Sequence, residues 1–302
     1  MWIVGASASG PLRGSARPAW STSTSRSIFV SWRSIVADRP LAGRTVLAVF
    51  AHPDDESLAC GGTLARLADA GARVVLLCGS RGESGSISDL ALVPDGDLAG
   101  VRTRELAEAA AVLGIADAIV LDHPDGDLRW DDVTEFHEEI VAALHQYRPD
   151  AVITFAEDGL YWHLDHIGVH ERTYTAVKTL GAGAPPLFYV TMPKGVMRKI
   201  AEAAHAKGGA LPDASFWGIE PDAFGDAAIP PTFSIDVRDW VPRKLAALRC
   251  HRTQMGPNNP IAWIDEDEAR RWLGSEYFRR SPLESGTAES VLEQLGEPVA
   301  SS

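Results

Sequence analysis

Two short clusters of histidine and carboxylate side chains carry the residue types that bind metal ions in this chain. The first is the sequence AHPDDE at residues 51–56, which offers His52, Asp54 and Asp55. Pro53 fixes its own backbone angle and shapes a turn, so side chains three positions apart, at 52 and 55, can converge on one ion. Acidic residues are also favoured in the first turn of a helix by its dipole, which is the plainer interpretation of these aspartates taken alone.

The second cluster is the sequence YWHLDH at residues 161–166, with His163, Asp165 and His166. Two histidines and a carboxylate are costly to bury unless they are hydrogen-bonded or bound to a metal. A hydrogen-bonded histidine network without a metal is the alternative for this cluster alone. Together the two clusters offer a His–Asp–His set, and three protein ligands with one open position are typical of a catalytic zinc.

Both clusters follow apolar runs that predict buried strands, the first directly and the second after a short acidic turn. Strand and helix patterns alternate along the chain, which predicts an α/β fold: a Rossmann-like open, mostly parallel sheet with helices on both faces. Ligands bind outside the carboxyl ends of the strands in such sheets, so both clusters are expected at one rim. The predicted strands are 45–51, 73–78, 118–121, 151–155, 187–191 and 232–237, and the predicted helices are 58–70, 101–113, 133–147, 166–180 and 241–255.

The clusters also carry a family resemblance. AHPDDE at 51–56 resembles the signature of the LmbE-like deacetylases, which include the N-acetylglucosaminyl-phosphatidylinositol de-N-acetylases (PIG-L), and HLDH at 163–166 resembles their HPDH motif with Leu164 in place of proline. The likeness extends from about residue 45 to 255. It implies a zinc-dependent hydrolase that removes an acetyl group from an N-acetylated amino sugar. It also implies one divalent ion per chain, zinc or ferrous iron, held by His52, Asp55 and His166.

The same resemblance assigns roles to the side chains around the metal. Asp54 would be the general base that takes a proton as water attacks the amide, and a protonated His163 would stabilise the oxyanion. Asp165 would orient His163. Tyr161 is similar in placement to a family tyrosine that assists the oxyanion, and packing beside Trp162 is the alternative interpretation.

Further motifs resemble the family's substrate contacts. Arg81 begins an RGE segment after the second predicted strand, and Asp125 lies in a PDG turn after the third. Both would bind the sugar, whereas a surface ion pair for Arg81 and an ordinary turn for Asp125 are the alternatives. Lys244, His251 and Gln254 follow a Lys…His-x-x-Gln pattern whose spacing predicts one helical face. They would close the site or be structural, and we assign them no catalytic role.

The amino-acid composition limits the kinds of partner and the location that we expect for the chain. The net charge of −13 would repel a phosphate backbone, which argues against nucleic acid as a partner. The expected partner, a small N-acetylated sugar, is what the family resemblance implies. The three cysteines are widely spaced and odd in number, so they indicate neither a disulfide framework nor a structural zinc site, and a cytoplasmic location is expected. No apolar run approaches the roughly 20 residues of a membrane helix. Nothing in the sequence indicates an oligomeric state.

Three segments are expected along the chain. Residues 1–44 would be a disordered or mis-assigned extension, residues 45–280 one deacetylase domain, and residues 281–302 a flexible tail. Residues 208–231 are rich in glycine, proline and alanine and predict a long loop.

Two other functions fit the same residues. One is an amidase that cleaves a larger amide, such as a thiol-sugar conjugate, with the same metal chemistry. The other is a non-catalytic sugar-binding protein on the same fold, although a metal binder alone would have no need of Asp54. The turn after the first strand has no GxGxxG, so the dinucleotide fingerprint is missing.

Overall fold

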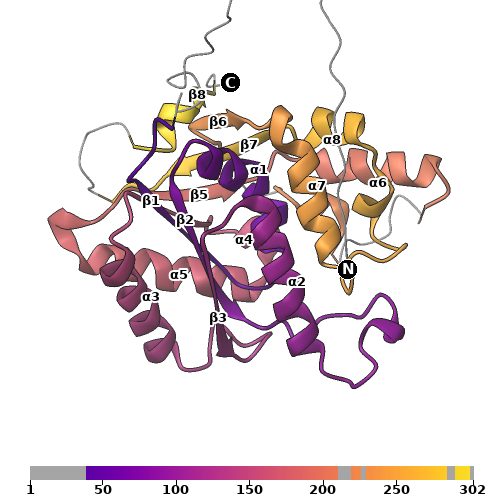
Figure 1. The fold of residues 1–302 in the computed structure, drawn as a ribbon, viewed down its shortest axis with the longest axis horizontal. Helices are drawn as coiled ribbons and strands as arrows, with labels where there is room; N and C mark the ends of the chain where they lie inside the picture. The colour runs from indigo at the N-terminus through magenta and orange to yellow at the C-terminus, as the bar shows by residue number, and fades with distance from the viewer. Residues whose placement is uncertain (1–38, 210–218, 226–228, 284–289, 300–302) are drawn as a thin grey trace, which may run out of the picture. The chain divides into compact units, whose positions relative to one another are not determined.

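Strand β1 (Thr45–Phe50) lies inside an eight-stranded sheet (Figure 1), and it is buried along nearly its whole length. The computed structural model describes residues 39–209, 219–225, 229–283 and 290–299. The strand order is β3-β2-β1-β4-β5-β7-β6-β8. The other strands are β2 (Arg73–Ser80), β3 (Asp117–His123), β4 (Ala151–Phe155), β5 (Leu187–Thr191), β6 (Phe233–Asp236), β7 (Ser275–Arg280) and β8 (Glu297–Pro298).

The first five strands are parallel, as the alternation of strand and helix predicted, and the last three pair antiparallel. From β1 the chain moves outward to β2 and β3, then returns to the other side of β1 as β4 and β5. The order therefore reverses between β1 and β4. A reversal of this kind opens a crevice at the carboxyl ends of the two strands, where α/β proteins bind ligands.

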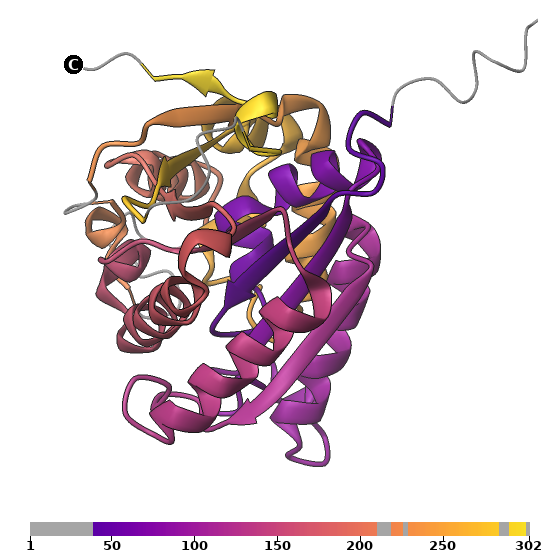
Figure 2. The ribbon, with the colours of Figure 1, turned by 90° about the vertical axis from the view of Figure 1, so that its left-hand side faces the viewer.

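Helices cover both faces of the sheet. Helices α1 (Asp55–Asp69), α2 (Leu98–Leu113) and α7 (Val241–Cys250) pack against one another on one face. Helices α3 (Val133–Tyr147) and α5 (Leu164–Thr179) pack together on the other face. They lie on the left in Figure 1, the side that faces the viewer in Figure 2. The remaining helices are α4 (Gly159–Trp162), α6 (Val196–Ala206) and α8 (Glu266–Leu273), with short 3-10 turns at 90–92, 181–183, 221–223, 238–240, 260–263 and 293–295.

Helix α1 is interrupted at Cys60, whose φ of −150° and ψ of 27° are not helical. The Glu276 carboxylate accepts hydrogen bonds from the backbone amides of Gly62 and Thr63 at 2.9 and 2.7 Å, and so caps the second half of the helix. Lys244 Nζ lies 2.6 Å from Glu276 Oε1 and donates to the Leu58 carbonyl at 2.9 Å. This buried pair fixes the first half of α1, which carries the AHPDDE turn.

The strand and helix predictions are largely confirmed, and two boundaries were wrong. Helix α7 was expected to reach residue 255 but ends at Cys250. The tail was expected to be flexible from residue 281, yet Val291 and Leu292 are buried and β8 pairs with β6. Burial of these two apolar side chains stabilises the segment, which the polar composition around them did not indicate.

At the other end, Leu41 is buried in the core and its amide donates to the Ala70 carbonyl at 3.0 Å, so packing begins before the expected boundary at residue 44. The expectation of a disordered extension falls mainly on residues 1–38, outside the described residues. The predicted long loop at 208–231 also lies partly outside them, at 210–218 and 226–228. No helix in the described residues is long and apolar enough to cross a membrane. The three cysteines are free, as expected.

Candidate active site

The AHPDDE turn connects β1 to α1 at the reversal of strand order. The backbone amide of His52 donates to Asp55 Oδ2 at 2.7 Å, which folds the turn back on itself. Between them Asp54 has φ 122° and ψ −24°, a conformation that favours glycine. Strained backbone of this kind costs about 1–3 kcal/mol and persists only where the surroundings hold it.

The second cluster lies across the crevice, after β4. Its backbone is also strained, because Leu160 and Trp162 both have a φ of 67°. His163 is the N-cap of α5, and its Nδ1 accepts a hydrogen bond from the Asp165 amide at 3.2 Å. Three of the four non-glycine residues with positive φ in the described chain thus flank one crevice, where strain commonly marks function.

Donor atoms of three side chains from the two clusters form a small triangle, in which Asp55 contributes both carboxylate oxygens. His52 Nδ1 lies 3.3 Å from His166 Nε2 and 3.5 Å from Asp55 Oδ2, and His166 Nε2 lies 3.2 Å from Asp55 Oδ1. Ligands about 2.0–2.2 Å from a tetrahedral ion lie roughly 3.3–3.6 Å from one another. The triangle therefore has the dimensions of three ligands around one ion.

The far nitrogens of both rings are already hydrogen-bonded. His52 Nε2 lies 2.9 Å from Asp165 Oδ2 and 3.0 Å from Asp125 Oδ1, and His166 Nδ1 lies 3.0 Å from the Gly159 carbonyl. These partners accept only, so each neutral ring carries its proton there and turns a lone pair into the triangle. Two lone pairs and a carboxylate facing one another need a cation between them, and a divalent metal fits this donor set.

The carboxylates around His52 also favour a positive charge at this point. Burial lowers the pKa of His52, but its hydrogen bonds with Asp125, Asp165 and Asp55 outweigh burial and raise the pKa well above its usual range. The pKa of Asp55 is held well below its usual range, because the attraction and hydrogen bond of His166 outweigh burial. Ring nitrogens of His52, His163 and His166 also lie within 4.8 Å of one another. Since His163 Nδ1 already accepts the Asp165 amide, Asp55 completes the triangle better.

A cavity of about 310 Å³ opens beside the triangle. It is lined by residues of the AHPDDE turn, of the loop after β2, of the PDG turn and of the second cluster. The lining residues are His52, Asp54, Asp55, Leu58, Ser84, Gly85, Ser86, Arg102, Asp125, Gly126, Tyr161, His163, Ile219 and Gln254.

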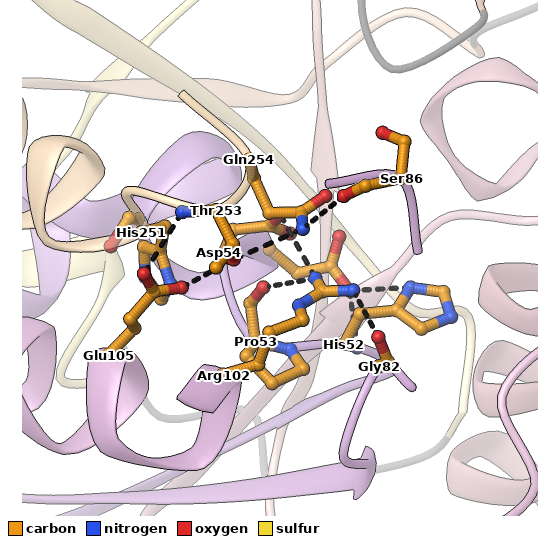
Figure 3. A network of polar contacts seen from close by, with 12 residues as sticks. His52, Pro53, Asp54, Gly82, Ser86, Arg102, Glu105, His251, Thr253 and Gln254 are labelled. Carbon is orange, nitrogen blue, oxygen red and sulfur yellow. Dashed lines mark hydrogen bonds and ion pairs between the residues drawn. The ribbon is translucent and has the colours of Figure 1, made fainter. Parts of the chain in front are cut away.

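Asp54 lines this cavity next to the triangle without belonging to it. Burial raises the pKa of its carboxyl to about 7, against the opposing charge of Arg102. Arg102 Nη2 lies 3.2 Å from Asp54 Oδ2 (Figure 3), and the Asp54 amide donates to Glu56 Oε2 at 3.1 Å. A carboxylate near neutral pKa that faces a cavity beside a metal site suits a general base.

His163 differs from its expected state. Burial and the charges of the neighbouring His166 and His52 lower its pKa to about 4, which favours a neutral ring over the protonated ring that the resemblance implies. Because Nδ1 accepts the Asp165 amide, the neutral ring carries its proton on Nε2. His163 can therefore donate one hydrogen bond into the cavity as a neutral imidazole.

The structure brings most of the predicted residues together. The Asp165 side chain, expected to orient His163, instead contacts His52 and the backbone amides of Gly126 and Leu128, at 2.8 and 3.1 Å from its two oxygens. Tyr161 lines the cavity, with its ring 4.6 Å from that of Phe224.

The two predicted substrate contacts lie differently. Asp125 lines the cavity, where it also accepts a hydrogen bond from the Ser84 amide at 2.9 Å. Arg81 is not among the lining residues, and its Nε lies 3.0 Å from Asp122 Oδ1.

Sequence reasoning missed Arg102 and left three residues of the late helix without a role. Helix α7 ends before His251, so Lys244, His251 and Gln254 do not share one helical face. Lys244 belongs to the buried pair with Glu276, and His251 Nε2 lies 3.0 Å from Glu56 Oε1. Gln254 lines the cavity, and its Nε2 donates to the Ser86 carbonyl at 2.9 Å (Figure 3).

A mostly parallel sheet with a His–Asp–His set at its reversal point defines an α/β protein with a candidate metal centre. Residues 47–177 match the family model for GlcNAc-PI de-N-acetylase (PIG-L). The chain is 32% identical over 277 residues to the 1D-myo-inositol 2-acetamido-2-deoxy-alpha-D-glucopyranoside deacetylase of Thermobispora bispora, covering 82% of this chain and 90% of the relative. The chain belongs to the PIG-L family of LmbE-like deacetylases.

Solved structures share the fold. The N,N'-diacetylchitobiose deacetylase of Pyrococcus horikoshii superposes with a TM-score of 0.51 at 22% identity, over 79% of this chain and 84% of that one. The 4-carboxy-2-hydroxymuconate hydratase GalB of Pseudomonas putida superposes with a TM-score of 0.55 at 19% identity, over 81% of this chain and 100% of that one. Since a deacetylase and a hydratase share this fold, the site has to carry the argument for an activity.

Proposed function

We propose that this chain is a metal-dependent hydrolase that removes the acetyl group from an N-acetylglucosaminyl compound. The observation that carries the proposal is the triangle of His52, Asp55 and His166, beside which His52, Asp54 and Asp55 line one cavity. Three ligands, an open side and a nearby base are what amide hydrolysis by water requires.

The three triangle residues would hold one divalent ion, for which zinc suits the nitrogen and oxygen donors and ferrous iron is the alternative. When bound, the ion would acidify the attacking water and polarise the amide carbonyl. Asp125 and Asp165 keep the His52 ring in the tautomer that this role needs.

The remaining chemistry belongs to side chains that line the cavity. Asp54 would take the proton from water as the water oxygen bonds to the carbonyl carbon. His163 Nε2–H would donate a hydrogen bond to the oxyanion of the tetrahedral intermediate, with Tyr161 beside it. The carbon–nitrogen bond then breaks, and the proton taken by Asp54 goes to the departing nitrogen. The products are acetate and a free amine.

The substrate we propose is a pseudodisaccharide of N-acetylglucosamine and inositol, the compound named for the Thermobispora relative. Its size and neutral polar surface suit a cavity of about 310 Å³ lined by serine, aspartate and glutamine side chains. Asp125 would accept hydrogen bonds from sugar hydroxyls. Arg81 would also contact the sugar, which requires it to leave Asp122.

The experiment is an assay of zinc-loaded protein with this pseudodisaccharide, in which free amine and acetate are both quantified. We expect equal amounts of the two products and a loss of activity on chelation. A matched compound with a larger acyl group or a thiol-bearing conjugate on the same amine tests the alternative amidase. Faster cleavage of that compound would mean that the protein is an amidase for larger amides and not a deacetylase. Binding of either compound without cleavage would mean that it is a sugar-binding protein.

A further inference from the structure

Arg102, in the second turn of α2, is the cation next to the proposed base. Its side chain is buried between the AHPDDE turn and the loop after β2 (Figure 3). Nη2 donates to the Pro53 carbonyl at 2.7 Å and lies 3.2 Å from Asp54 Oδ2, while Nη1 donates to the Gly82 carbonyl at 2.7 Å. One guanidinium thus joins two segments of the cavity wall.

The contacts fall on the strained part of the AHPDDE turn. Asp54 has a φ of 122°, which only its surroundings can maintain. Arg102 holds the carbonyl just before this residue and the carboxylate of the residue itself. Without the guanidinium, the strained peptide and the carboxylate both lose the partner that directs them toward the cavity.

The loop after β2, residues 82–88, is shaped to the same guanidinium. A Cβ atom at Gly82 would lie 2.3 Å from Arg102 Nη1, and one at Gly85 would lie 2.5 Å from it. Glycine at both positions therefore lets the backbone rest on the guanidinium. The far side of loop 82–88 is tied down where the Ser88 amide donates to the Thr253 carbonyl at 2.8 Å.

Helix α2 supports this second attachment as well. Glu105, three residues after Arg102, accepts hydrogen bonds from the Thr253 amide and hydroxyl at 2.9 and 2.6 Å. One face of α2 therefore holds both ends of loop 82–88. Among the cavity-lining residues of the described chain, Arg102 is the only lysine or arginine.

We infer that Arg102 is a positioning residue for deacetylation, which orients the Asp54 carboxylate and holds loop 82–88 against the cavity. This role rests on the proposed function. The hydrogen bonds of Arg102 within the described residues go to Pro53, Asp54 and Gly82, so its side chain acts directly on the base and not on the donor atoms of the triangle. A lysine cannot replace it, because one ammonium group does not reproduce the planar fork that reaches three oxygens.

The test compares Arg102→Ala and Arg102→Lys with Arg243→Ala. Arg243 is a matched control, because it also donates to two backbone carbonyls, of Val112 and Leu113, and to Asp69, but does not line the cavity. With the zinc-loaded protein and the pseudodisaccharide, we expect kcat of Arg102→Ala to fall about 10²-fold at an unchanged metal content, with a much smaller change in KM. Arg243→Ala should keep the parent kcat.

Chemical rescue separates positioning from general damage. Guanidinium chloride, well below denaturing concentrations, should restore part of the kcat of Arg102→Ala but not change that of Arg243→Ala, and sodium chloride should restore none. If Arg102→Ala does not fold, Arg102→Lys carries the test, because it keeps the charge and most of the volume. A parent-like kcat in Arg102→Lys, or a kcat loss in Arg102→Ala that follows lost metal, would overturn the inference.

Hydrogen exchange tests the same role without a substrate. Amides of residues 54–57 and of loop 82–88 should exchange faster in Arg102→Ala than in the parent, and should be unchanged in Arg243→Ala. If the parent cleaves none of the compounds, the proposed function fails and the exchange experiment alone decides the role of Arg102. Unchanged exchange in either segment of Arg102→Ala would overturn it.

Discussion

The carboxylate of Asp165 lies 2.9 Å from Nε2 of His52, so the second histidine cluster supports the imidazole of the first. The backbone amides of Gly126 and Leu128 hold the same carboxylate at 2.8 and 3.1 Å. Histidine ligands of metals are usually oriented in this way by an acceptor on the far nitrogen. The relationship joins the segments that follow β1, β3 and β4, so the proposed metal binding would depend on all three of them.

Asp165→Asn should therefore weaken metal binding while leaving the three proposed ligands in place. Loss of such a partner typically costs about 10- to 100-fold in metal affinity. Zinc titration against a competing chelator measures the change. Asp55→Ala, which removes a proposed ligand, is the comparison and should lose far more. Parent-like affinity in Asp165→Asn would show that the carboxylate does not support His52.

Lys244 is predicted to be structural. Its Nζ lies 2.6 Å from Glu276 Oε1, and both side chains are buried. Lys244→Met would leave the Glu276 charge buried and unpaired, so the free energy of unfolding should fall by about 3–5 kcal/mol. Urea denaturation measures it, and the double variant Lys244→Met/Glu276→Gln should recover part of the loss. If stability is unchanged while KM rises, Lys244 belongs to substrate binding instead.

The sequence predicts those parts of the site that depend on strand order alone. The AHPDDE turn and the second cluster each follow an apolar run, and carboxyl ends of parallel strands share one edge of a sheet. This argument placed His52 and His166 together, and His52 Nδ1 lies 3.3 Å from His166 Nε2. It needs no knowledge of side-chain directions.

The role of Arg102 depends on the direction of its side chain, which strand order does not predict. It lies in an amphipathic helix rich in charged residues, where neighbouring Arg104 is exposed and Arg102 is 3% exposed. Only the distant Pro53 and Gly82 carbonyls distinguish the two. The end of α7 was missed for a similar reason, because the Glu105 carboxylate binds Thr253 and tertiary contacts override the helical pattern.

His170, one helical turn after His166, predicts a pH dependence of the free energy of unfolding. Burial lowers the pKa of His170 below 6.5, and the charge of Arg279 lowers it further. The Phe155 carbonyl and the charges of Glu157 and Glu171 raise the pKa but do not outweigh burial. At pH values between the folded-state pKa of His170 and 6.5, the unfolded chain binds more protons than the folded chain. The stability that the neutral His170 contributes above pH 6.5 is therefore lost as pH falls below 6.5.

His170→Gln should remove that dependence. The difference in free energy of unfolding between parent and variant is expected to shrink as pH falls from about 7.5 to 5, and denaturation at several pH values measures it. Taking the difference cancels the contribution of the other titrating groups. A difference that stays constant over this range would mean that His170 has an ordinary pKa in the folded protein.

Asp54→Asn tests the proposed base most directly. Asparagine keeps the size of the side chain but cannot take a proton, and Asp54 is not part of the triangle. Because positioned acid–base groups contribute roughly 10²–10⁴-fold to rate, kcat on the pseudodisaccharide should fall by at least about 10² with the zinc content unchanged. Asp97→Asn is the matched control, since asparagine caps α2 as well as aspartate does. Near-parent turnover at full metal occupancy would remove Asp54 from the mechanism, and loss of both metal and activity would make it a ligand.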